Sequence, residues 1–235
     1  MKIRVIALHD LVYSDRQLEN FFDFLNSYFH LVNLKDFKSG YFKPCILLTA
    51  DDGYDDWKKF IPIVEKYNFS LMLGVCTSFI DPLISYSKKT AILTENLHRS
   101  KRGVIPISVG TFQELSSHKN VIIADHSYDH IDFGSSDVSV LEAQIQKSQD
   151  VFNVYNINVN DFIFPFGQRH NVPHYHDIEN ILKEYGYTRG WGFYRRFPPR
   201  RFLLPRTGID PSMPKIEIIA RISRARAISV DWMHE

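Results

Sequence analysis

The sequence predicts a single-domain α/β fold in which a parallel sheet closes into a barrel. Apolar, β-rich runs alternate with segments of helical period over nearly the whole chain, which is typical of α/β proteins. The 235 residues, 44% of them hydrophobic and 14% aromatic, suit one large core, so we expect one domain over residues 1–235. Polar residues follow four of the expected strands, as they do at the active-site rim of a parallel barrel.

The first half of the chain supplies three expected strands and two helices. Ser14 and Gln17 form a capping-box pattern ahead of apolar residues that share one helix face. The expected strands are 3–8, 45–49 and 69–75, and the second helix is 55–67. Residues 77–110 carry scattered charges and prolines, and we expect little regular structure there.

The second half continues the alternation. Thr111 and Glu114 predict the start of a short helix by a second capping-box pattern, and Gly186 is expected to end a later helix. The expected strands are 121–124, 161–165, 187–193 and 227–231, and the expected longer helices are 136–155 and 177–185. Residues 216–222 fit a helix or a strand.

Composition narrows the partners and the location. A net charge of +1 gives no general attraction for nucleic acid. The N-terminal apolar run is short and broken by Arg4, which is unlike a signal peptide, and no run is long enough for a membrane span. We therefore expect a cytoplasmic protein. Cys45 and Cys76 both lie in apolar runs and are expected to be buried thiols.

An arginine-rich segment, residues 189–206, stands out from this even charge. It interleaves six arginines with aromatic residues and contains no acidic residue; the arginines are Arg189, Arg195, Arg196, Arg200, Arg201 and Arg206. One interpretation is a solvated face or loop. The other is a groove for an anionic sugar, a nucleotide or a lipid phosphate, because arginine pairs with such groups and aromatic rings stack on sugars and bases.

Two histidines four positions apart, His126 and His130, predict half of a metal site. A catalytic zinc site usually has three protein ligands and one open position for water. The third ligand is expected to be Asp51 or Asp52, which follow another apolar run, and spacing does not distinguish them. A second cluster (His170, His174 and His176) is either a further metal locus or a polar loop at the mouth of the pocket.

These residues resemble motifs of the polysaccharide deacetylases of the NodB-homology type, carbohydrate esterase family 4. Thr49-Ala50-Asp51-Asp52-Gly53 is similar to the first family motif, Thr-Phe/Tyr-Asp-Asp-Gly. His126-Ser127-Tyr128-Asp129-His130 matches the second, His-Ser/Thr-x-x-His, and Phe164-Pro165-Phe166-Gly167 is similar to the third, Arg-x-Pro-Tyr-Gly. The resemblance covers residues 3–210 and implies a distorted (β/α)7-type barrel.

One feature points to a subgroup. Ala7-Leu8-His9-Asp10 resembles the circularly permuted arrangement of poly-N-acetylglucosamine deacetylases, in which the catalytic histidine precedes the Asp-Asp motif. The resemblance thus implies that His9 is the catalytic histidine, with His234 as the competing candidate.

The resemblance also implies the roles of the other residues. Asp51 would be the general base, Asp52, His126 and His130 would bind a divalent metal, most simply Zn²⁺, and the backbone N–H of Phe166 would stabilise the oxyanion. Ile163 stands where the family has an arginine that braces the catalytic aspartate, and we expect Arg206 to replace it. The expected substrate-binding residues are Trp191, Pro165, Gly167, Arg195 and Arg196.

The implied function is metal-dependent removal of N-acetyl groups from a carbohydrate. The expected substrate is a sugar of a surface polysaccharide or lipopolysaccharide, or its precursor, and a phosphate-linked form would suit the arginines. Two alternatives remain open: hydrolysis of a non-sugar amide such as a cyclic imide or ureide, and a noncatalytic sugar-binding protein that retains its metal.

Overall fold

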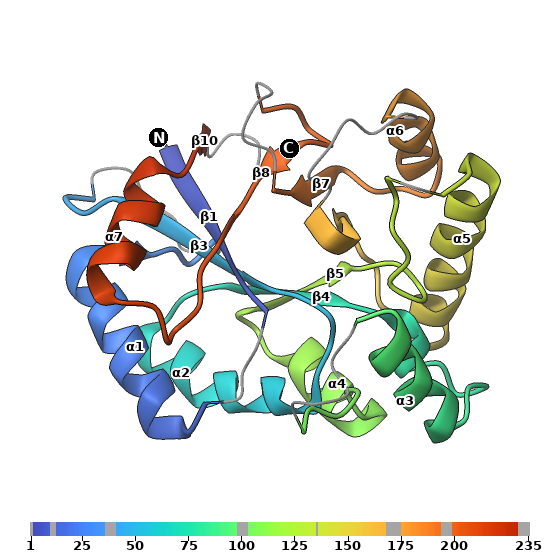
Figure 1. Ribbon diagram of the computed structural model, residues 1–235, viewed down its shortest axis with the longest axis horizontal. Helices are drawn as coiled ribbons and strands as arrows, with labels where there is room; N and C mark the ends of the chain where they lie inside the picture. Colours follow the sequence, from blue (N-terminus) through green and yellow to red (C-terminus); the bar gives the residue numbers. More distant parts are fainter. Residues whose placement is uncertain are drawn as a thin grey trace.

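The barrel sheet consists of parallel strands in an order that follows the chain. A computed structural model describes residues 2–9, 13–35, 41–97, 103–134, 136–167, 175–193 and 199–229 (Figure 1). Neighbouring strands in the sheet are β1 (Lys2–Leu8), β3 (Cys45–Ala50), β4 (Leu71–Val75), β5 (Val121–Asp125), β6 (Asp161–Ile163) and β7 (Arg189–Gly192). Every pair in this series is parallel, so the predicted α/β barrel of the (β/α)7 type is confirmed.

A short segment near the C-terminus closes the barrel. β8 (Leu204–Pro205) pairs in parallel with β7, and β9 (Thr207–Gly208) pairs in parallel with β1. Arg206 is the single residue between these two strands, so it lies where the sheet passes from β7 back to β1. We call residues 204–208 the closing segment. The sequence analysis did not predict β8 or β9.

Two further strands extend the sheet. β10 (Ala227–Ser229) runs antiparallel to the first residues of β1, within the predicted last strand. The two-residue strand β2 (His30–Leu31) lies beside β3 and was not predicted.

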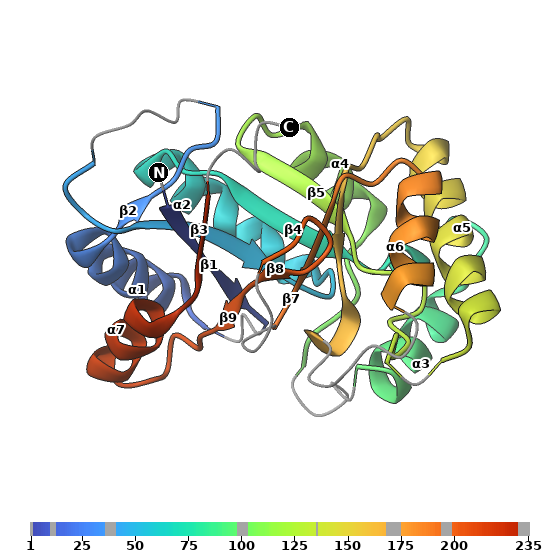
Figure 2. The same cartoon turned by 90° about the horizontal axis from the view of Figure 1, so that it is seen from above.

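Helices cover the outside of the barrel. α1 (Asp15–Tyr28) and α7 (Lys215–Arg224) lie on one side, and α5 (Val138–Val154) and α6 (Tyr175–Glu184) lie on the opposite side (Figures 1 and 2). The predicted capping box of Ser14 and Gln17 starts α1, whose buried face carries Leu18, Phe21, Phe22 and Leu25. α2 (Phe60–Tyr67) continues from the 3-10 turn Asp55–Lys59. The described chain has no helix of the length and apolarity that crossing a bilayer requires.

The region predicted to be irregular is partly helical. α3 (Tyr86–Glu95) forms there with Ser85 as its N-cap, so that prediction is wrong. Its buried residues are only Ile92 and Leu93, which explains why no apolar stripe marks it in the sequence. α4 (Val109–Ser117) is capped by Ser108 instead of Thr111, and the ambiguous residues 216–222 belong to the helix α7.

The interior of the barrel follows the two-residue period of its strands. Alternate residues of each strand point inward and form a buried cluster that includes Ile3, Val5, Cys45, Leu47, Met72, Ala124, Ile163, Trp191 and Leu204. Residues between them, such as Ile6 and Ile46, join the larger core under the helices. Both cysteines are buried free thiols, as predicted.

Candidate active site

The alternation of inward-facing side chains continues past the ends of the strands. It places several polar side chains together at one end of the barrel. His9 follows β1, Asp51 follows β3 and His126 follows β5, each two residues after an inward-facing position. Arg206 continues the alternation of Leu204 in the closing segment. These are the carboxyl ends of parallel strands, where barrel enzymes place their catalytic groups.

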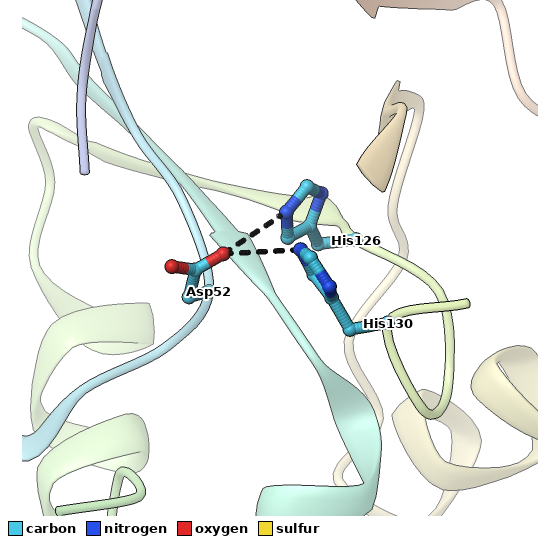
Figure 3. A group of neighbouring side chains, drawn as sticks. All are labelled: Asp52, His126 and His130. Atoms are coloured by element: carbon cyan, nitrogen blue, oxygen red, sulfur yellow. Dashed lines mark ion pairs between the residues drawn. The ribbon is translucent and has the colours of Figure 1, made fainter. Parts of the chain in front are cut away.

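Three of the predicted residues form a compact set of potential metal ligands. Nε2 of His126 and Nε2 of His130 each lie 3.3 Å from the same oxygen, Oδ1 of Asp52. Figure 3 shows this one oxygen facing both rings. The ligand atoms lie within 4.8 Å of one another, and all three residues are buried. The structure therefore brings Asp52, and not Asp51, between the two histidines.

The hydrogen bonds of His126 show that this set fits a cation. The carbonyl oxygen of Ile163 lies 2.7 Å from His126 Nδ1 and can only accept, so Nδ1 carries the proton. In a neutral ring, Nε2 then presents a lone pair to Asp52 Oδ1. Two facing lone pairs repel each other, and a metal ion between them would remove that repulsion. Two imidazoles and one carboxylate form a ligand set found in catalytic zinc sites.

The surroundings of Asp52 orient it for this task. The phenol of Tyr54 donates a hydrogen bond to Oδ2, which leaves Oδ1 directed at the histidines. Burial acts to raise the pKa of Asp52, but without a metal the protonated rings of His126 and His130 can donate to it, and this outweighs burial and holds that pKa well below its ordinary value. Asp52 is therefore ionised at neutral pH, as a metal ligand must be.

The backbone at these ligands adopts an uncommon conformation. Asp52 has φ of 82° and His130 has φ of 57°, both in the left-handed region that side chains usually avoid. Ser127, at φ of 65°, accepts the N–H of His130 through Oγ at 3.0 Å and so fixes the turn between the histidines. Strained residues of this kind gather at functional sites, where the surrounding structure holds them in place.

Asp51 is buried beside the ligand set and forms an ion pair with Arg206. Nη1 and Nη2 of Arg206 donate to Oδ1 and Oδ2 of Asp51 at 2.6 and 2.9 Å, and Nη1 also donates to Thr49 Oγ1 at 3.0 Å. Burial acts to raise the pKa of Asp51, but the charges of Arg206 and His9 outweigh it and lower that pKa. Arg206 thus contacts Asp51 from the closing segment, and its role as the brace that Ile163 does not provide stays a prediction.

His9 stands on the open side of Asp51. Its Nε2 lies 3.4 Å from Asp51 Oδ2, and its side chain is 34% exposed while that of Asp51 is 2% exposed. The ring of His9 stacks on Phe193 with centroids 5.4 Å apart, and the guanidinium of Arg206 lies 5.1 Å from the centre of the same phenyl ring. Phe193 therefore supports both partners of Asp51.

The turn after β6 forms another wall of the site. Phe166 has φ of 56°, is 44% exposed, and packs against His130 with ring centroids 4.6 Å apart. Gly167, with φ of 62°, leaves no room for a side chain, because an added Cβ would lie 1.8 Å from Phe193. Pro165 is buried beside them. The oxyanion role of the Phe166 N–H stays a prediction.

Trp191 differs from its predicted place in the wall of a sugar pocket. It is 0% exposed, belongs to the inner core cluster, and donates its indole N–H to Asp161 Oδ1 at 2.8 Å. Its position in β7 explains this, because it points into the barrel one layer below Phe193. The side chain is a core residue, and the predicted contact with substrate is wrong.

The arginine-rich segment divides into different environments. Arg189 and Arg206 form ion pairs inside the barrel, with Asp161 and Asp51 respectively, so neither the solvated-face nor the groove interpretation applies to them. Arg200 and Arg201 are exposed. Arg195 and Arg196, predicted to bind substrate, lie outside the described residues.

The predicted histidine clusters are only partly described. His176 is exposed on α6, whereas His170 and His174 lie outside the described residues. The competing catalytic candidate, His234, also lies outside them. Within the described residues, the metal-ligand set of Asp52, His126 and His130 is the one group of its kind.

Three supporting residues were missed in the sequence. Thr49 and Phe193 continue the inward period of β3 and β7, so a strict count of alternating positions would have identified both. Tyr54 follows the first motif directly, but no local pattern indicates that its phenol turns back to Asp52.

Comparisons with known proteins agree on one family. The family model described as "Polysaccharide deacetylase" matches residues 39–190. No curated protein sequence matches the chain. The solved structures of similar fold include the Streptococcus pyogenes deacetylase PplD in complex with acetate, with a TM-score of 0.65, 17% identity, and coverage of 94% of this chain and 98% of that one.

Two other structures show the same likeness. IcaB from Ammonifex degensii has a TM-score of 0.67 at 14% identity and covers 94% of this chain and 97% of its own. A de-N-acetylase from Aggregatibacter actinomycetemcomitans has a TM-score of 0.65 at 16% identity and covers 93% of this chain and 99% of its own. At these identities the likeness concerns the fold.

Proposed function

Because this chain belongs to the polysaccharide deacetylase family, we propose that it is a metal-dependent hydrolase that removes N-acetyl groups from a carbohydrate. The observation that carries the proposal is the contact of Asp52 Oδ1 with two imidazole nitrogens, 3.3 Å away in each case, beside the ionised Asp51. Amide hydrolysis needs an activated water, a stabilised oxyanion and a proton for the amine. Each need has a candidate group at this end of the barrel.

Asp51 is the proposed general base. It is buried, ionised and held in a fixed orientation by the two donors of Arg206. A carboxylate whose pKa is lowered in this way is a weak base. A divalent cation held by Asp52, His126 and His130, which we propose to be zinc, would supply the Lewis acidity that a base this weak requires.

His9 is the proposed general acid. Its imidazole lies on the more exposed side of Asp51, where a departing amine can reach it. Stacking on Phe193 limits its rotation, so the proton is held in one direction. The Phe166 N–H, in the turn packed against His130, is the proposed donor to the oxyanion.

The substrate is proposed to be a sugar of a surface polysaccharide or of its precursor. This rests on the family and on the fold shared with IcaB and the other deacetylases, including the subgroup in which the histidine precedes the Asp-Asp motif. The predicted phosphate link and the predicted cytoplasmic location rest on sequence alone and stay predictions.

Metal removal tests the proposal. Acetate release from N-acetylhexosamine oligomers should stop after dialysis against a chelator and return when zinc is added back. A His126→Gln variant, treated in parallel, should stay inactive after zinc is returned, because it lacks one ligand. Acetate release that survives complete removal of metal, or no release from any N-acetylated sugar by the zinc-loaded protein, would contradict the proposal.

A further inference from the structure

A small pocket lies next to His9. It has a volume of about 230 Å³ and lies between β9 and α7. His9 and Gly208 form one wall, and Asp210, Met213 and Arg221 form much of the remainder. None of the proposed metal ligands lines it, but the proposed acid His9 does.

The strand pairing fixes this pocket beside the proposed acid. Gly208 is the partner of Ala7 in the parallel pair of β9 and β1, and the N–H of Ile209 donates to Ala7 O at 3.0 Å. Residues 208–210 therefore run directly alongside His9. One edge of the His9 ring faces Asp51, with 3.4 Å between Nε2 and Oδ2, and the ring also borders the pocket.

We infer that this pocket binds a neutral sugar ring of the substrate, attached through the nitrogen that His9 protonates. The inference rests on the proposed function, because an amine protonated by His9 has its carbon skeleton next to His9. The acetyl carbon must lie near Asp51 and the metal ligands. The sugar then extends past His9, and the pocket is the space available there.

The two charged residues of the pocket are oriented before any ligand arrives. Asp210 Oδ1 accepts the backbone N–H and the hydroxyl of Ser212 at 2.7 and 2.6 Å, and also the phenol of Tyr13. Arg221 is held by Glu217, whose Oε1 accepts from Nε at 2.9 Å and lies 2.8 Å from Nη2. Preorganised polar groups bind at a lower entropic cost than mobile ones.

This combination of charges selects the class of ligand. A carboxylate accepts and a guanidinium donates hydrogen bonds, so together they suit the hydroxyl groups of a sugar, which do both. A phosphate in so small a pocket would be repelled by the carboxylate of Asp210, and a charged amine would be repelled by the guanidinium of Arg221. Met213 and Ile209 add apolar surface for the C–H face of a ring.

The size of the pocket also limits the ligand. Sites for drug-sized molecules usually span about 300 to 1,000 Å³. A volume of about 230 Å³ is smaller, and it suits one pyranose ring. The remaining sugars of a polymer would lie outside it.

Replacing Arg221 tests the inference. In Arg221→Gln, the KM for acetate release from chitotetraose should rise about tenfold, because a hydrogen bond from a charged donor is lost. The kcat should stay the same, because Arg221 contacts no reacting atom. Hydrolysis of p-nitrophenyl acetate, which has an acetyl group but no sugar, should be unchanged.

Two matched variants act as controls. Glu217→Gln breaks the same pair on α7 but keeps the guanidinium, and Arg224→Gln removes an equal charge from an exposed position of the same helix. Arg224→Gln should keep the KM of the parent, whereas Glu217→Gln should raise it less than Arg221→Gln does, because the guanidinium is kept but no longer held. An Arg221→Gln variant with an unchanged KM for chitotetraose would overturn the inference.

A direct binding measurement separates this inference from the proposed function. Calorimetric titration with chitotetraose should show binding that Arg221→Gln weakens about tenfold, whether or not acetate is released. Binding without acetate release would contradict the proposed function and support the pocket. Acetate release with equal binding by both proteins would do the reverse, and the absence of both would overturn both.

Discussion

Two arginine–aspartate pairs lie inside the barrel, one near each end. Arg206 contacts Asp51 at the carboxyl ends of the strands, at 2.6 and 2.9 Å. Arg189 contacts Asp161 at the start of β6 and β7, where Nε to Oδ1 is 2.7 Å and Nη2 to Oδ2 is 2.8 Å. Both pairs are bidentate and have similar distances, but Arg206 binds through Nη1 and Nη2 and Arg189 through Nε and Nη2.

Their neighbours differ. The other partner of Asp161 is the indole N–H of Trp191, a donor that does not ionise at neutral pH. The other partner of Asp51 is His9, whose side chain is partly exposed, and Asp52 with its two histidines lies alongside. The neighbours of a bidentate ion pair therefore decide the role that we expect for it. The pair of Arg206 and Asp51 borders the groups proposed to react, whereas the pair of Arg189 and Asp161 does not.

The largest expected effect comes from neutralising the two aspartates in turn. Asp51→Asn should lower kcat/KM by roughly a hundredfold to ten-thousandfold, the usual contribution of a general base. Asp161→Asn should leave the kcat of the folded protein near that of the parent but destabilise it by about 3–5 kcal/mol, because Arg189 loses its buried partner. Acetate release and urea denaturation measure the two outcomes.

An Asp51→Asn variant that kept full activity would remove Asp51 as the base. A folded Asp161→Asn variant that lost as much activity as Asp51→Asn would show that the pair of Arg189 and Asp161 is not purely structural.

A smaller effect is expected on the pH profile when the arginines are replaced. Arg206→Gln removes the largest influence that lowers the pKa of Asp51, so that pKa should rise. A base must be ionised, and activity is lost as the pH falls through its pKa. The acid limb of the kcat/KM profile should therefore move to higher pH in Arg206→Gln.

Arg189→Gln is the matched control. It breaks the pair with Asp161 and should leave the acid limb of the kcat/KM profile in place. Stability gives a second readout. A lowered pKa of Asp51 stabilises the fold above the ordinary aspartate pKa of about 4, and this stabilisation is lost as the pH falls. An acid limb that does not move in Arg206→Gln would show that Arg206 does not set the ionisation of Asp51.

The smallest expected effect concerns Trp191. Trp191→Phe removes the donor to Asp161 while keeping an aromatic ring in the core, and it should cost about 1–3 kcal/mol of stability. The KM for N-acetylated sugars should not change, because the side chain is not accessible. A raised KM in a well-folded Trp191→Phe variant would mean that the neighbourhood of Asp161 also influences substrate binding.

Much of the site was predictable because each strand end shows two features in the sequence, an apolar run and the polar residues directly after it. The apolar runs before Asp51 and His126 indicate buried parallel strands, and the polar residues that follow them meet at one rim. Asp51, Asp52, His126 and His130 were therefore identified together, and the structure brings them together with His9. Arg206 also contacts Asp51, as its predicted role requires, although no strand was expected around it and the role itself stays a prediction.

The failures come from elements with weak local signals. The closing segment consists of two strands of two residues each, too short to show a period, and one of them contains Pro205. α3 buries only Ile92 and Leu93 and has no apolar stripe. Trp191 was assigned to a pocket because aromatic residues stack on sugars, but its place in the alternation of β7 decides its direction.

The closing segment has a consequence for the order of assembly. Its residues follow β1 to β7 in the chain and complete the cylinder, and Arg206 is the residue at the join. Until that join forms, Asp51 has no guanidinium beside it, and a carboxyl enclosed without a counter-charge tends to take up a proton. The ionised form of Asp51 is thus stabilised only when the cylinder is complete, so a chain with an open seam would lack this carboxylate as well as a closed core.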